Sequence, residues 1–207
     1  MVNRGTTGQL LKRLKKHNGW GYAHSLRVGN CAGKAGVYLG LGEMAVQELV
    51  TAALLHDIGK LLVPSGILDK PGPLTGTEYR TVKRHTEYGY WIVKLLGYPD
   101  AVCEAVRNHH ERYDGKGYRK QKETSLFARI ISVADAWDAM GYSRPYREGM
   151  GEETIYQAMK EEAGTQFDPA VWGAMVPVLF PDRKTGSCGK GDSSPDTLRT
   201  ARKGGHL

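Results

Sequence analysis

The sequence has few of the features that mark secreted or membrane-embedded proteins. Its three cysteines, Cys31, Cys103 and Cys188, lie far apart without a C-x-x-C pair, so neither a disulfide framework nor a thiolate zinc site is expected. No apolar run reaches the roughly 18 residues that span a bilayer, and the first residues lack the apolar stretch of a signal peptide. We therefore expect a cytoplasmic protein with no membrane partner.

Acidic residues are scarce at the two ends of the chain, and this explains the net charge of +7. Residues 1–17 carry five bases and no acid, and residues 182–207 carry six bases and three acids. Residues 18–181 are nearly neutral, with 18 bases and 19 acids. A nucleic-acid-binding domain is expected to carry its basic stripe on folded structure. Duplex nucleic acid is therefore not an expected partner.

Length and periodicity indicate one helical domain. The 207 residues are 40% hydrophobic and 25% charged, which suits a single core. Apolar residues recur at spacings of three and four, which predicts an all-α fold, a single helical bundle. We expect a basic N-terminal segment over 1–17, the domain over 18–181 and a disordered tail over 182–207. The stretch 10–16 suits a linker helix or a dimer contact, so a homodimer stays open.

Local signals set the expected helices and their ends. Thr75 and Glu78 have the spacing of a capping box, and Asp168 before Pro169 is typical of an N-cap followed by a first-turn proline. Four glycines between 29 and 40 lie on roughly one helix face, which favours close packing of another helix. The expected helices span 22–41, 43–58, 75–96, 100–110, 126–140, 152–162 and 169–179.

Histidine is also rare, yet five of the seven histidines fall within or at the ends of expected helices: His24, His56, His85, His109 and His110. A single histidine on an apolar face is more often a hydrogen-bonded core residue than a ligand. Five in one domain favour a shared site, because a divalent metal uses imidazole lone pairs without protonating them. With Asp57 and Asp135, the ligand set contains nitrogen and oxygen but no sulfur, which favours iron or manganese.

Such a ligand set indicates phosphoester hydrolysis. Two ions about 3.5 to 4 Å apart can hold a bridging hydroxide and clamp a phosphate for in-line attack on phosphorus. A carboxylate is needed besides imidazole, since it can bridge the two ions and offset their charge.

An ordered set of motifs runs through residues 22–178. The motifs are HSLRV (24–28), LHDIGK (55–60), ILDKPGPLT (67–75), HTEYG (85–89), HHERYDGKGY (109–118), ADAWDAM (134–140), RPYR (144–147) and GTQFDP (164–169). In this set the sequence resembles the HD-GYP family of cyclic di-GMP phosphodiesterases, bacterial signalling enzymes within the HD superfamily of metal-dependent phosphohydrolases.

The resemblance implies roles for particular residues. Asp57 would bridge two divalent ions, and Lys60 would stabilise the charge that develops on the phosphate. Tyr118 would stack on a guanine, while Arg144 and Arg147 would hold the substrate phosphates. Taken alone, Lys60 also suits a solvated helix end, and Arg144 a helix cap. The implied metal ligands are His56, Asp57, His85, His109, His110 and Asp135, with His24 as a partial or supporting ligand and Asp138 as a supporting carboxylate.

Two positions depart from the family pattern. Arg119 stands in place of the proline of the Gly-Tyr-Pro triplet, in a loop that is also shortened, and this puts substrate preference in question. Trp20 stands where some members carry a glutamate ligand for a third metal. We therefore predict two metals, and the linear dinucleotide pGpG as a plausible end product beside GMP.

Three functions stay open at this stage. The first is hydrolysis of cyclic di-GMP to pGpG or GMP. The second is an HD-superfamily phosphohydrolase that acts on another nucleotide, which Arg119 favours. The third is a non-catalytic module that binds a cyclic dinucleotide or docks a partner. The family is usually joined to a sensory or receiver domain, and none fits before His24, so either the regulator is a separate protein or the sequence is a piece of a longer one.

Overall fold

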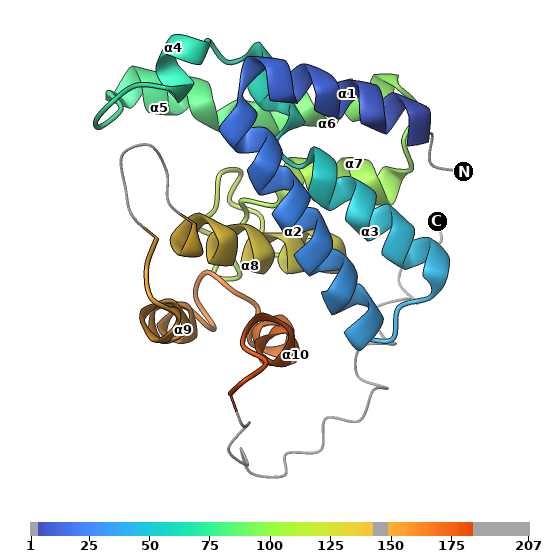
Figure 1. Ribbon diagram of the computed structural model, residues 1–207, viewed down its shortest axis with the longest axis vertical. Helices are drawn as coiled ribbons and strands as arrows, with labels where there is room; N and C mark the ends of the chain where they lie inside the picture. Colours follow the sequence, from blue (N-terminus) through green and yellow to red (C-terminus); the bar gives the residue numbers. More distant parts are fainter. Residues whose placement is uncertain (1–3, 143–148, 184–207) are drawn as a thin grey trace.

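The computed structural model describes residues 4–142 and 149–183, and these residues form helices joined by turns and loops (Figure 1). The expected all-α class is confirmed, since the described residues contain no β-strand beyond an isolated bridge between Ala163 and Phe167. The elements are α1 (Arg4–His17), α2 (Gly19–Tyr38), α3 (Glu43–Leu55), the 3-10 helix η1 (Ile58–Leu62), α4 (Ser65–Leu68), α5 (Gly76–Lys83), α6 (His85–Leu95), α7 (Asp100–Asn108), α8 (Leu126–Gly141), α9 (Glu152–Glu161) and α10 (Pro169–Leu179).

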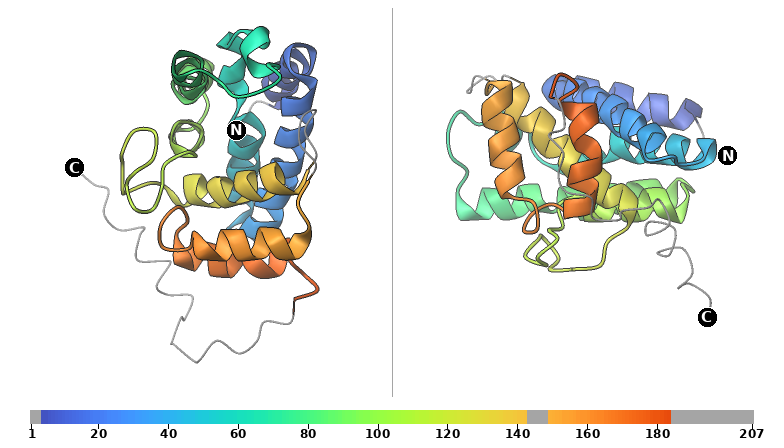
Figure 2. Two further views of the ribbon diagram at one scale, coloured as in Figure 1. Left: turned by 90° about the vertical axis from the view of Figure 1, so that its left-hand side faces the viewer. Right: turned by 90° about the horizontal axis from the view of Figure 1, so that it is seen from below.

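The long helix α2 organises the bundle. It packs against α3 along one side and against α8 along another, while α7 contacts both α3 and α8. Helices α4, α5 and α6 lie at one end and α9 and α10 at the other (Figure 1). The loop between α7 and α8 projects from one side of the bundle (Figure 2). No helix in the described ranges has both the length and the hydropathy to cross a membrane.

Glycines allow α2 and α3 to approach closely, as their spacing predicts. A Cβ added at Gly29 would lie 2.8 Å from Leu54 Cδ2, and one at Gly33 would lie 2.9 Å from Val50 Cγ2. Either contact is closer than van der Waals packing permits. The small residues therefore set the spacing of the two helices that carry His24 and lead to His56.

Helix α1 shares the core of the bundle. Leu14 is fully buried and Leu10 nearly so, within the same apolar cluster as the residues of α2, α3 and α7. The hydroxyls of Thr7 and Tyr98 lie 2.8 Å apart, and His17 Nε2 hydrogen-bonds to the Val63 carbonyl oxygen at 3.0 Å. The basic residues of α1 thus accompany an apolar face that packs onto the domain.

The helix expected over 22–41 spans Gly19–Tyr38, and two further expected helices break beside a histidine of the site. The helix expected over 43–58 ends at Leu55, and the one expected over 75–96 divides at Arg84 into α5 and α6. At both breaks a histidine side chain hydrogen-bonds to the carbonyl three residues earlier, a group that a continuing helix would use itself. The capping box of Thr75 and Glu78 and the N-cap Asp168 are confirmed.

Candidate metal centre

Three histidines occupy equivalent positions at the ends of helices. His56 follows α3, His85 comes just after α5, and His109 follows α7. In each, Nδ1 hydrogen-bonds to the carbonyl oxygen three residues earlier, at 2.7, 2.7 and 2.8 Å respectively. The last carbonyls of a helix lack helical partners and can only accept, so each Nδ1 must donate. This fixes Nε2 as the nitrogen with the free lone pair.

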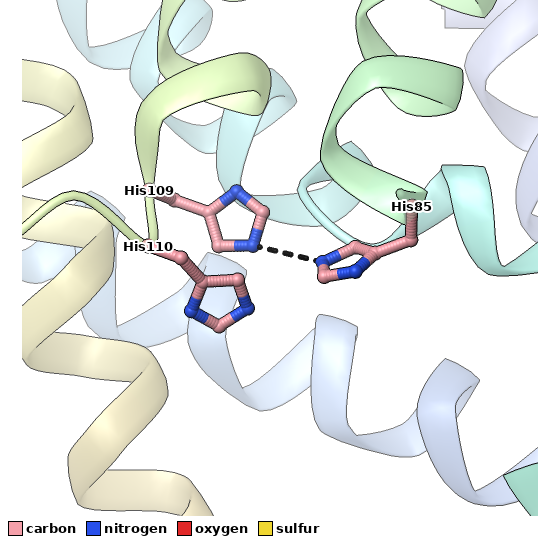
Figure 3. Close-up of side chains that lie close together, drawn as sticks. All are labelled: His85, His109 and His110. Carbon is pink, nitrogen blue, oxygen red and sulfur yellow. Dashed lines mark hydrogen bonds between the residues drawn. The ribbon is translucent and has the colours of Figure 1, made fainter. Parts of the chain in front are cut away.

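The Nε2 atoms of these residues converge. The His85 and His109 Nε2 atoms lie 3.4 Å apart, beside the His110 ring (Figure 3). The His56 and His109 rings meet edge to face with centroids 5.0 Å apart. Three sets of donor atoms lie close enough to hold a metal ion: His85, His109 and His110; His24, His56 and Asp135; and His56, Asp57 and His109.

Asp57 lies between these sets. Its Oδ1 is 3.3 Å from His85 Nε2, while its Oδ2 is 3.5 Å from His56 Nε2 and 2.5 Å from the ammonium of Lys60. The two oxygens therefore face different histidines. This orientation suits a carboxylate that bridges two neighbouring cations.

Gly59 brings the Asp57 turn against α6. A Cβ at this position would lie 1.9 Å from the His85 carbonyl oxygen and 2.5 Å from the Gly89 nitrogen. Only glycine permits this approach, because both obstructing atoms belong to the backbone. The glycine of the LHDIGK motif thus sets the distance between Asp57 and His85.

His24 completes the opposite side of the cluster. Its Nε2 lies 2.9 Å from Asp135 Oδ1, and its Nδ1 lies 2.7 Å from Asp138 Oδ2. Asp138 is itself held by Arg27, whose Nε donates to Oδ1 at 2.6 Å. The Trp20 ring stacks on the His24 ring with centroids 5.4 Å apart and an interplanar angle of 5°. Asp138 thus supports His24, as expected of a supporting carboxylate.

Burial determines the charge state of the histidines. It lowers the pKa of His56 and His109 and brings the pKa of both His85 and His110 to about 3. These rings are therefore neutral near pH 7, which is the form that ligates a metal.

The acidic side of the cluster behaves differently. Burial works against a charged His24, yet hydrogen bonds to Asp135 and Asp138 outweigh it and raise the pKa of His24 to about 9. The pKa of Asp57 is held well below its usual range despite burial, chiefly by Lys60. The pKa of Asp135 is also lowered, chiefly by its hydrogen bond to His24. Both carboxylates are therefore ionised.

One buried atom tests whether this cluster fits a divalent ion. His56 is fully buried, and its Nε2 has no hydrogen-bond partner although it faces Asp57 and Asp135. An unsatisfied buried acceptor of this kind costs free energy. A cation coordinated at Nε2 would satisfy it, so the residues present fit a divalent metal ion.

Three side chains of the cluster are partly exposed to solvent. His110, Asp135 and Lys60 have exposed side-chain fractions of 28%, 17% and 16%, whereas His24, His56, Asp57 and His85 are at or below 2%. The opening of the centre is therefore defined by these three residues, which a substrate would meet first. The apolar groove of about 830 Å³ between α2, α3 and α10 has none of the histidines in its lining.

Tyr118 borders this opening. Its ring lies 4.6 Å from the His110 ring, measured between centroids, and 6.4 Å from the His85 ring. Gly117 permits the placement, because a Cβ there would lie 2.5 Å from Glu111 Cα. Arg144 and Arg147 lie outside the described residues.

The loop that carries Tyr118 is held by glutamates that sequence reasoning did not single out. The buried Glu111 accepts the backbone N–H of Arg119 at 2.6 Å and that of Gln121 at 2.8 Å. The Arg119 guanidinium lies 3.3 Å from Glu87, which also pairs with Arg107. Arg119 is thus paired with a carboxylate. The sequence signals for this arrangement were only that Glu111 directly follows His110 and that Glu87 lies two residues after His85.

Comparison with known proteins assigns the chain to a family. The family model described as HD domain matches residues 9–171, and the chain belongs to this family. Curated relatives narrow the assignment to its HD-GYP branch. A cyclic di-GMP phosphodiesterase of Thermotoga maritima is 37% identical over 160 residues, which cover 75% of this chain and 44% of that protein.

Two further similarities concern a second curated relative and a solved structure of the same fold. A 3'3'-cGAMP-specific phosphodiesterase of Vibrio cholerae is 41% identical over 139 residues, covering 65% of this chain and 30% of that protein. The HD domain of the L. monocytogenes phosphodiesterase PgpH, solved with cyclic di-AMP, superposes with a TM-score of 0.64 at 18% identity, covering 96% of this chain and 99% of that chain. The chain spans less than half the length of both curated relatives.

Proposed function

We propose that this chain hydrolyses a phosphodiester bond of a cyclic dinucleotide at a centre of two divalent metal ions, with cyclic di-GMP as the substrate. The observation that carries the proposal is the convergence of four neutral histidines, three of them buried, and of His24 on two ionised aspartates. Relatives named for cyclic di-GMP and for 3'3'-cGAMP support a cyclic dinucleotide as the substrate class.

The chain supplies a ligand set for two ions. His85, His109 and His110 would hold one ion, and His56 and Asp135 the other, with Asp57 shared between them and His24 supporting Asp135. Bound divalent ions supply activated water and neutralise phosphate charge. The oxygen and nitrogen donors favour iron or manganese.

Side chains at the opening would bind the scissile phosphate. The Lys60 ammonium is the cation beside Asp57 and is partly exposed on the open side. It is therefore placed to stabilise the charge that builds up on a non-bridging phosphate oxygen. Tyr118 would border the substrate, and Arg144 and Arg147 would hold its phosphates.

A second candidate is hydrolysis of a different cyclic dinucleotide. The replacement of the family proline by Arg119, together with a relative specific for 3'3'-cGAMP, favours it. The Arg119 guanidinium pairs with Glu87. The replacement of proline by Arg119 would therefore affect substrate choice through the shape of the loop and not through the arginine charge.

Product analysis tests the proposal. Anaerobically purified protein loaded with Mn²⁺ or Fe²⁺ is incubated separately with cyclic di-GMP and 3'3'-cGAMP, and the products are separated by chromatography. Linear dinucleotide or GMP that disappears in an Asp57→Ala control would support hydrolysis, and the better substrate decides between the two candidates. Bound metal with no turnover of either compound would contradict the proposal and favour a non-catalytic binding module. The cytoplasmic location, the separate regulator and the homodimer stay predictions.

A further inference from the structure

A lysine and two tyrosines meet at the rim of the metal centre. The Lys83 ammonium lies 4.4 Å from the centroid of the Tyr118 ring and 5.7 Å from that of the Tyr79 ring. The Tyr79 side chain hydrogen-bonds to that of Tyr118. Burial is the largest cause of the raised pKa of Tyr118, and the contact with Tyr79 raises that pKa further. Tyr118 in turn contacts His110. The end of α5 is thus joined to the opening of the centre through Tyr118.

In the described part of the chain, Lys83 has no acidic partner, unlike three other cations around the centre. Lys60 pairs with Asp57, Lys70 with Glu78, and Arg119 with Glu87. Within residues 4–142 and 149–183, by contrast, no carboxylate oxygen lies within 4.0 Å of the Lys83 ammonium, which rests on the tyrosine rings. Its charge is therefore available to an anion at the rim.

Tyr79 offers the exposed aromatic surface at this place. The residue is 49% exposed and lies one helical turn before Lys83 on α5. Tyr118 is less accessible, because His110, His85 and Lys83 all contact its ring. An exposed ring beside an unpaired cation is the combination that binds a nucleobase and its phosphate.

We propose that Tyr79 and Lys83 form a second subsite, which stacks a base and binds the phosphate that is not being cleaved. The inference rests on the proposed function, because a cyclic dinucleotide has two phosphates and two bases. When one phosphate is at the metal centre, the other phosphate lies within the same small ring of the substrate and needs a counter-charge near the opening. Lys83 is placed to supply it, on the side of the opening formed by Tyr118.

Steady-state kinetics of the metal-loaded protein with two substrates tests the subsite. Cyclic di-GMP has the second phosphate and the bases, whereas bis(p-nitrophenyl) phosphate lacks both. Lys83→Met should raise KM for cyclic di-GMP about tenfold, since it removes a charge-assisted contact. Tyr79→Leu should raise KM about fivefold through lost stacking. Both variants should hydrolyse bis(p-nitrophenyl) phosphate within about twofold of the parent rate, a margin of under 0.5 kcal/mol.

Conservative variants and a distant lysine serve as controls. Lys83→Arg keeps the charge and Tyr79→Phe keeps the ring, so both should retain most of the affinity for cyclic di-GMP. Lys160→Met removes an exposed lysine on α9, at the other end of the bundle, and should change neither substrate's kinetics (Figure 1).

The outcomes separate this inference from the function on which it rests. An unchanged KM for cyclic di-GMP in Lys83→Met, with an active parent protein, overturns the subsite alone. Equal losses with both substrates also overturn it, because they indicate a structural role for α5. A parent protein that cleaves bis(p-nitrophenyl) phosphate but no cyclic dinucleotide overturns the proposed function, and the subsite with it.

Discussion

The Lys60 ammonium lies 2.5 Å from Asp57 Oδ2, the oxygen that also faces His56. Both residues are held by the short 3-10 helix η1 and the turn before it. Lys60 therefore competes with any cation for this oxygen, and it also borders the opening of the centre. Loss of the Lys60 ammonium is therefore expected to favour metal binding but to slow catalysis.

Replacing Lys60 by methionine separates the two effects. Lys60→Met should lower kcat about 100-fold, because one electrostatic contact to the developing phosphate charge is lost. Metal affinity should be retained or increased, since a competing cation is removed from Asp57. Turnover and elemental analysis of the same preparations measure both. Lys94→Met, which removes a surface lysine paired with Asp100, is the control. Loss of metal together with activity would assign Lys60 to holding Asp57 instead.

Gly59 is expected to be the least replaceable glycine of the centre. An alanine Cβ would meet the His85 carbonyl oxygen at 1.9 Å, and neither backbone can move without displacing a ligand. Gly59→Ala should therefore lower the free energy of unfolding by about 3 kcal/mol or more. Gly66→Ala on α4 is the matched control, because its Cβ would meet nothing within 4 Å. Urea unfolding curves measure the free energy of unfolding of both variants. A small loss in both would contradict the prediction, because it would show that the backbone at Gly59 and His85 can move apart at little cost.

The sequence located the helices, but it did not show how the ends of the helices place the histidines of the site. Periodicity and caps located the helices, and the rarity of histidine indicated a cluster. The breaks after Leu55 and at Arg84 were missed, because periodicity continues through them. At each break a histidine, His56 or His85, hydrogen-bonds to the backbone carbonyl three residues earlier, and hydrophobic periodicity does not report such a side-chain bond.

The support for the Tyr118 loop was also beyond the sequence. The departure at Arg119 was visible as a missing proline, and it pointed to a charge near the ligand. The backbone N–H of Arg119 bonds to Glu111 across the loop, eight residues away, and its guanidinium pairs with Glu87, 32 residues away. No local pattern specifies such contacts, although each glutamate follows a histidine motif closely.

Restoring the family proline should therefore destabilise this chain. Arg119→Pro removes the N–H that Glu111 accepts at 2.6 Å and leaves one oxygen of a buried carboxylate without this partner. The expected loss is about 1 to 3 kcal/mol in the free energy of unfolding. Arg119→Ala keeps the N–H and loses only the partly exposed ion pair with Glu87, so it should cost less than about 1 kcal/mol. A proline variant as stable as the parent would contradict this account.

The histidines predict how stability depends on pH in the metal-free protein. His85 and His110 have a folded-state pKa of about 3 against an ordinary value of 6.5. Below pH 6.5 the unfolded chain binds protons that the folded chain does not, so stability falls as the pH drops from 6.5 towards 3. His24 has the opposite sign, because its folded-state pKa is about 9. Its contribution is complete below pH 6.5 and is lost as the pH rises through 9.

Stability of the chelator-treated protein should therefore be greatest near pH 6.5 and lower at both pH 5 and pH 8.5, as measured by urea unfolding. His110→Gln should flatten the acid side of this profile, because one of the imidazoles that stay neutral in the folded protein is gone. His24→Gln should flatten the alkaline side, since the protonated ring between Asp135 and Asp138 is removed. Stability that rises from pH 6.5 to pH 8.5 would contradict the assignment of His24, because a protonated His24 requires the reverse.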